Sequence, residues 1–127
     1  MDLKSTGKTK EEILAAARSI EEVALDVVEW RVDWYEDVFS IQEVLDTARQ
    51  LKEALGQIPV LFTFRTSKEG GEKEISPEQY AQLNKAVSES GFVDLIDVEA
   101  FTGDEIVSSI IAHAHAHGIK VIVSNHD

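Results

Sequence analysis

The sequence predicts an α/β fold in which about four parallel strands alternate with four helices around a sheet with one inner face, as in a barrel. Three observations support this fold class. Helical and strand segments alternate along all 127 residues, as in sheets built from right-handed crossovers. The connections from helix to strand are short, and those from strand to helix are longer and polar. Each strand also carries polar side chains near its C-terminal end.

The four helices are predicted from residues that favour helix starts and stops. Thr9 is suited to be the N-cap of the first helix, and the SIQE segment at Ser40 matches a capping box. Ser76 precedes a proline in SPEQ, which is typical of a helix start. Glycines follow the last three helices. The expected helices span residues 10–24, 40–56, 76–91 and 104–117.

The strands are predicted from short runs of β-branched and aromatic residues between the helices. The opening segment MDLKST is too polar to indicate a buried strand, so the expected number remains at about four. The loops after the strands are expected to carry the chemistry, as in other parallel α/β folds. The expected strands span residues 27–33, 60–65, 93–99 and 120–124.

The first strand, VVEWRVD, places charged residues on one face and apolar residues on the other. Successive side chains point to opposite faces, so Glu29, Arg31 and Asp33 share a face. An open doubly wound sheet is covered by helices on both sides and favours apolar strands, whereas a barrel has one inner face. We therefore expect Glu29 and Arg31 to point into a barrel mouth, paired with each other. The alternative is a structural ion pair on an edge strand.

The later strands repeat this pattern near their C-terminal ends. Their paired polar residues are Thr63 and Arg65, Asp97 and Glu99, and Ser124 and His126. His126 directly follows an apolar strand and has an intrinsic pKa suited to general acid–base catalysis, although a histidine that only caps the strand is the alternative.

The HAHAH segment contains a histidine pair at helical spacing. His113 and His117 lie four residues apart, on one face of the last helix, which would suit a metal ion. No third ligand is apparent in the sequence, and the HExxH pattern is absent. Imidazolium groups at a helix C-terminus are the simpler explanation, so no metal site is predicted.

The composition excludes several classes of partner and location. The net charge of −12 and the lack of a basic run argue against nucleic acid and against an anionic membrane surface. The chain has no cysteine and no apolar segment of the ~20 residues needed to cross a bilayer. The N-terminus does not resemble a secretory signal. A cytoplasmic protein is expected.

Four segments together resemble the type I 3-dehydroquinate dehydratase family: VEWRVD, LFTFRTSKEGGE, LIDVEAFTG and VIVSNHD. The resemblance implies a TIM (β/α)8 barrel that dehydrates 3-dehydroquinate to 3-dehydroshikimate in the shikimate pathway, through a Schiff base and without cofactor or metal. By matching position, it implies that Glu29, Arg31 and Arg65 bind substrate. It also implies that His126 is the catalytic acid–base, that Glu69 orients this histidine, and that Asp97 supports the site.

The chain departs from this family pattern in its length. A full barrel needs ~250 residues, and the 127 residues here match the N-terminal half, so the expected fold is a partial TIM (β/α)8 barrel, or half-barrel. The family's Schiff-base lysine falls on the strand that would come next. Lys68 and Lys120 are nearest to the site in sequence, and neither matches it. We expect no activity from the chain alone.

Two other hypotheses follow from the same residues. A half-barrel exposes two strand edges and its inner face, so the chain could be a non-catalytic binding or structural module that self-associates, most simply as a homodimer. A flavodoxin-like open sheet is a weaker alternative, because the strand faces are charged and no phosphate-binding loop is present.

Overall fold

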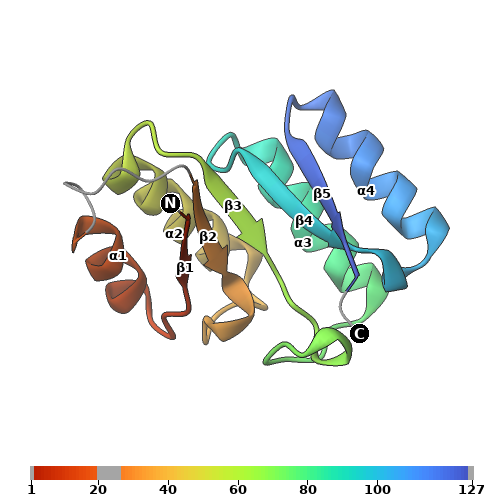
Figure 1. The fold of residues 1–127 in the computed structure, drawn as a ribbon, viewed down its shortest axis with the longest axis horizontal. Coiled ribbons are helices and arrows are strands. Elements are labelled where there is room, and N and C mark those ends of the chain that lie inside the picture. The colour runs from red at the N-terminus through yellow and green to blue at the C-terminus, as the bar shows by residue number, and fades with distance from the viewer. Residues whose placement is uncertain (1, 20–26, 126–127) are drawn as a thin grey trace.

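The computed structural model describes residues 2–19 and 27–125, which form one sheet with helices packed against it (Figure 1). The sheet contains five parallel strands in the sequential order β1-β2-β3-β4-β5. They are β1 (Asp2–Ser5), β2 (Val27–Arg31), β3 (Val60–Thr63), β4 (Leu95–Glu99) and β5 (Lys120–Ser124). No helix in the described part of the chain is both long and apolar enough to cross a membrane.

The strand β1 corrects the expectation drawn from the polar N-terminal segment. Asp2–Ser5 pairs with β2 in a parallel register that runs from Asp2 opposite Val27 to Ser5 opposite Trp30. At the edge of a sheet, backbone pairing with one neighbour is sufficient to form a strand, so polar composition does not prevent it. The sheet therefore has one strand more than the sequence led us to expect.

The four expected helices are present. They are α1 (Lys10–Ser19), α2 (Ile41–Leu55), α3 (Pro77–Ser90) and α4 (Asp104–Ala116). The end expected for the first helix, at residue 24, lies outside the described residues. The Glu12 amide donates to Thr9 Oγ1 at 3.1 Å, so Thr9 caps α1 as predicted. Positive φ angles at Gly56 and Gly91 end α2 and α3.

A second correction concerns where the strands end. The strand β2 stops at Arg31, and residues Val32–Trp34 form a 3-10 turn, so Asp33 does not continue the alternating face. Asp33 is fully buried, because the turn brings its carboxylate among hydrogen-bond donors from two other segments. The strand β3 is likewise shorter than expected and ends at Thr63.

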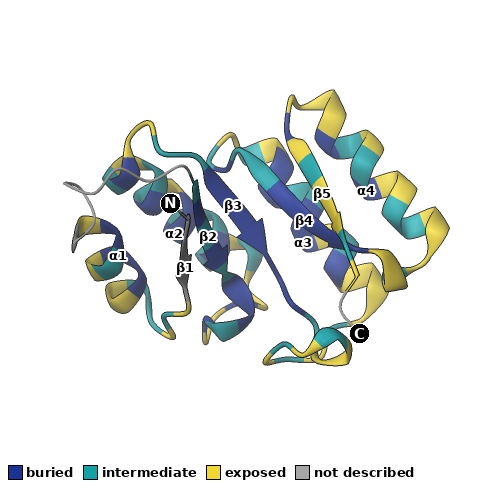
Figure 2. Cartoon of the chain, in the orientation of Figure 1, coloured by how far each residue is buried: buried dark blue, intermediate teal, exposed yellow. Residues whose placement is uncertain are grey.

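The hydrophobic core lies between the sheet and the helices, which cover one face of the sheet (Figure 2). Alternate strand residues enter this core, including Trp30, Phe62 and Ile96, and they meet apolar side chains of α2, α3 and α4. Sequential strand order with all helices on one side is the arrangement of half a TIM barrel. A flavodoxin-like sheet would have a reversal in strand order and helices on both faces, so that alternative is excluded.

The N-cap of α3 is a point where a single hydroxyl contributes to stability. Ser76 Oγ accepts a hydrogen bond from the Gln79 amide at 3.1 Å. We expect Ser76→Ala to lower the free energy of unfolding by about 1 kcal/mol, since this amide would lose its partner. Urea denaturation measures the change. Ser108→Ala, at an exposed position within α4, should be close to neutral, and equal losses in both variants would contradict the capping role.

An ion pair ties α1 to α2. Lys10 Nζ lies 2.8 Å from Asp46 Oδ2, and Arg49 Nη2 lies 2.8 Å from Asp46 Oδ1. Hydrogen bonds from Lys10 and then Arg49 lower the pKa of Asp46 from 3.8 to about 2. The stability gained from Asp46 is therefore complete above a pH of about 4, and it is lost as the pH falls through about 2.

We expect the Asp46→Asn variant to be less stable than the original chain at pH 7. The difference in unfolding free energy should shrink between pH 4 and pH 2 and then vanish, because the native carboxyl becomes protonated as well. Denaturation curves at several pH values test this. A difference that stays constant down to pH 2 would show that the charge of Asp46 is not its source.

Candidate active site

Polar side chains gather on the inner face of the sheet, the face opposite the helices, toward the C-terminal ends of the strands. The parallel register places Arg31 beside Thr63 and Glu99 beside Ser124. Arg65, two residues beyond the end of β3, contacts side chains of both β4 and β5. The predicted convergence of polar groups from four strands is present in the structure.

Arg65 lies at the centre of a buried ionic cluster. Its Nη1 is 3.0 Å from Asp97 Oδ1 and 3.0 Å from Glu99 Oε2. It also donates to Ser124 Oγ, whose hydroxyl donates in turn to Asp97 Oδ1 at 2.7 Å. Burial opposes the charge on the guanidinium, but the hydrogen bonds and charges of the two carboxylates outweigh it and raise the pKa of Arg65. This arginine is therefore held as a fixed cation.

Glu99 joins β4 to the loop that follows β3. Its carboxylate accepts hydrogen bonds from the Thr66 amide at 3.0 Å and from Thr66 Oγ1 at 2.7 Å. On the other side of the strand, the Tyr80 hydroxyl accepts from the Glu99 amide and donates to the Asp97 carbonyl. Burial raises the pKa of this tyrosine. The carboxylates of β4 are thus positioned from both faces of the sheet.

Asp33 is a second organising residue, and the sequence had given no indication of this role. Its carboxylate pairs in bidentate fashion with Arg31, at 3.0 Å from Nε and 2.9 Å from Nη2. It also accepts from the backbone amides of Arg65 and Glu72. The ammonium of Lys73 donates to the Asp33 carbonyl. Asp33 therefore connects the ends of β2 and β3 with the loop of residues 66–74.

The pairing expected on β2 differs from the pairing found. We expected Glu29 and Arg31 to pair with each other, but Arg31 takes Asp33 as its ionic partner. Glu29 Oε2 instead accepts a hydrogen bond from the buried Thr63 hydroxyl at 2.7 Å. Glu29 and Arg31 share one face of β2, but Glu29 bonds to Thr63 and Arg31 pairs with Asp33. A bidentate carboxylate leaves the Arg31 guanidinium in one defined orientation.

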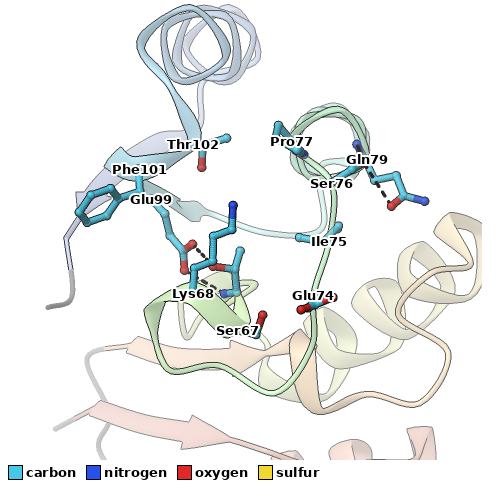
Figure 3. A pocket seen from close by; sticks show the side chains of 11 residues that line it. Ser67, Lys68, Glu74, Ile75, Ser76, Pro77, Gln79, Glu99, Phe101 and Thr102 are labelled. Atoms are coloured by element: carbon cyan, nitrogen blue, oxygen red, sulfur yellow. Dashed lines mark hydrogen bonds between the residues drawn. The ribbon is translucent and has the colours of Figure 1, made fainter.

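A pocket of about 470 Å³ opens beside this face, between the loop after β3 and the turn after β4 (Figure 3). Its walls include Thr66, Glu74, Ile75 and Phe101, and Lys68 lies between the two walls. Of the inner-face carboxylates, Glu99 reaches this pocket. Lys120, in contrast, is the first residue of β5 and therefore lies at the N-terminal end of the strands, away from the polar cluster.

Glu69 lies on the 3-10 turn Ser67–Glu69, which ends at Gly70 with a positive φ angle of 90°. Its side chain is half-buried. The histidine that it is expected to orient, His126, lies outside the described residues. The proposed pairing of Glu69 with His126 therefore stays a prediction. The other four predicted residues lie on the inner face of the sheet: Glu29, Arg31, Arg65 and Asp97.

Comparison with known proteins agrees with this architecture. The profile of the type I 3-dehydroquinase family matches residues 4–127. The chain belongs to the type I 3-dehydroquinase family. The 3-dehydroquinate dehydratase of Clostridium botulinum (strain Eklund 17B / Type B) is 51% identical over 121 residues, which cover 95% of this chain and 48% of that protein. The enzyme of Clostridioides difficile (strain 630) is 48% identical over the same share of each chain.

Solved structures of type I 3-dehydroquinase relatives share this fold. The Clostridium difficile type I 3-dehydroquinate dehydratase, crystallised with covalently modified comenic acid, superposes with a TM-score of 0.97 at 46% identity and covers 99% of this chain and 50% of that one. The Enterococcus faecalis 3-dehydroquinate dehydratase gives a TM-score of 0.95 at 40% identity, over 99% and 52%. This type I 3-dehydroquinase chain thus spans about half the length of the relatives it matches.

Proposed function

We propose that this chain forms the substrate-binding half of a 3-dehydroquinate dehydratase active site. The observation that carries the proposal is the set of oriented charges on the inner face, contributed by Glu29, Arg31 and Arg65. The resemblance to the family implies that these positions bind the substrate, a hydroxylated ring that bears a carboxylate. A guanidinium held in one orientation is well suited to bind such a carboxylate.

We assign a proposed role to each of these side chains from its chemistry. Arg31 and Arg65 would hold the anionic ring, and Glu29 would accept a hydrogen bond from a ring hydroxyl. His126 would remove the proton and assist the departure of water, with Glu69 orienting its imidazole. Of the two lysines nearest to the site in sequence, Lys68 lies in the neighbouring pocket, and Lys120 lies at the start of β5, at the opposite end of the strand from the polar cluster. We infer that the chain binds substrate but does not turn it over alone.

Calorimetric titration of the chain with 3-dehydroquinate tests the binding step. We expect Arg31→Met to weaken binding by at least about tenfold, since a charged hydrogen bond to the carboxylate is lost. Glu29→Gln should also weaken it, by a smaller factor. Arg49→Met, on the exposed face of α2, serves as the control and should bind as the original chain does. Equal affinity in all four proteins would contradict the proposed site.

A second candidate function, a self-associating half-barrel, is favoured by the exposed edge at β5. Ile122 and Val123 on this strand are 42% and 53% exposed, and Phe101 beside it is 66% exposed. Apolar side chains on an unpaired strand edge favour association with a second copy. Light scattering at micromolar concentration should show a dimer, and a monodisperse monomer would contradict this proposal.

We also infer a cytoplasmic location, which is the finer conclusion beyond the absence of a membrane-spanning helix among the described residues. The lack of any cysteine supports it, because secreted domains of this size often depend on disulfides.

A further inference from the structure

The C-terminal ends of α3 and α4 bring together two histidines and a carboxylate. His113 and His117 lie on the last turn of α4 and at its C-cap, with ring centroids 4.8 Å apart. Glu89 comes from the end of α3, which packs against α4. The potential ligand atoms of these three residues all lie within 4.8 Å of one another. The third ligand that the sequence did not reveal is therefore supplied by the neighbouring helix.

One hydrogen bond fixes the tautomer and the orientation of the His117 ring. His117 Nδ1 donates to the His113 carbonyl at 2.9 Å, which leaves the Nε2 lone pair available. A histidine that ligates a metal commonly donates its other ring N–H to a backbone carbonyl in this way, because the bond fixes the tautomer and the ring orientation.

His113 presents its Nε2 to the same point. That nitrogen lies 3.1 Å from Glu89 Oε1, and it is a buried atom that makes no well-aligned hydrogen bond with any described residue. Two ligand atoms at about 2.0 Å from one tetrahedral ion lie roughly 3.3 Å apart. The separation found between His113 and Glu89 is close to that value, so little movement is needed to accommodate an ion.

We propose that Glu89, His113 and His117 bind one Zn²⁺ ion. Two imidazoles and a carboxylate form a ligand set that Zn²⁺ accepts, and water would take the fourth position because Glu89 and His117 are exposed to solvent. A net charge of −12 further favours cation binding. The ion would link the ends of α3 and α4.

This site is distinct from the candidate active site. Helices that follow parallel strands run back antiparallel to them, so the C-terminal ends of α3 and α4 lie at the edge where the strands begin (Figure 1). The polar inner-face cluster lies at the opposite end, where the strands finish. The proposed ion would therefore stabilise the helical layer without contributing to the dehydration.

Calorimetric titration with Zn²⁺, together with thermal unfolding, tests the proposal on the full chain. We expect one equivalent to bind and to raise the Tm. His113→Ala, His117→Ala and Glu89→Gln should each weaken binding by at least about tenfold, because each removes a ligand. Glu89→Gln changes an exposed side chain and so retains the fold. Mg²⁺, which prefers oxygen ligands, should not bind in the same range.

His115→Ala is the matched control. His115 lies on the same helix between the two proposed ligands and is exposed, but it does not belong to the cluster. It should leave both the affinity for Zn²⁺ and the Tm increase unchanged. An equal loss in His115→Ala, unchanged affinity in the three ligand variants, or no binding by the original chain would overturn the proposal and leave an ordinary side-chain contact between His113 and Glu89.

Discussion

Replacing Arg65 with methionine is expected to lower the free energy of unfolding by about 3 kcal/mol, a large fraction of the stability of a domain this size. Arg65, Asp97 and Glu99 are only 8%, 4% and 2% exposed. Without the guanidinium, two neighbouring carboxylates remain buried without the cation that compensates their charge. Removing one partner of a buried ionic cluster is much more costly than replacing the whole cluster with apolar groups.

Arg49→Met is the control for this experiment. Arg49 also pairs with two carboxylates, Asp46 and Glu53, but on the solvent-exposed surface of α2. Exposed ion pairs contribute little, so this variant should unfold close to the original chain in guanidinium chloride. If Arg65→Met were as stable as Arg49→Met, the buried cluster would not be a main contributor to the stability of the inner face.

Replacing Gly71 with alanine is the second change expected to have a large effect. A Cβ at this position would overlap the Arg65 carbonyl oxygen and would lie 2.8 Å from the Thr66 carbonyl oxygen. Both contacts are with backbone atoms, so no side-chain movement relieves them. The loop after β3 would have to shift, which would disturb the bonds of Asp33 to the Glu72 amide and to Lys73. We expect a loss of about 3 kcal/mol.

Gly91→Ala separates steric overlap from backbone strain. Gly91 ends α3 with a φ of 79°, but a Cβ there meets nothing within 4 Å. Alanine should therefore cost only about 1 kcal/mol, the penalty for the left-handed conformation. Urea denaturation of both variants measures the two effects. A loss in Gly71→Ala no greater than that in Gly91→Ala would contradict the close approach of the loop to Arg65.

The periodic features of this chain were predictable from its sequence. Helix caps at Thr9, Ser40 and Ser76 are local, because each depends on residues within one turn. The polar inner face was also predictable, since side-chain alternation in strands places Glu29 and Arg31 together and does the same for Asp97 and Glu99. Both features depend on short-range geometry.

The contacts that the sequence did not predict connect distant segments. Asp33 leaves the strand pattern because its partners include the amides of Arg65 and Glu72, more than thirty positions away. Glu89 lies one helix away from His113, so no spacing rule links them. The strand β1 forms through pairing with β2, and its own polar residues do not indicate it. In each of these three cases the structure depends on a contact between segments that are distant in the sequence.

The most direct test of the proposed function is a turnover measurement made by complementation. The chain is assayed with 3-dehydroquinate alone, and then as a purified complex with the separately produced second half of the Clostridium botulinum relative. Ultraviolet absorbance of the conjugated product reports the rate. We expect no turnover by the chain alone, turnover by the complex, and loss of that turnover in a complex carrying Arg31→Met. Turnover by the chain alone, or an assembled complex that stays inactive, would contradict the proposal that this chain supplies the substrate-binding half of the active site.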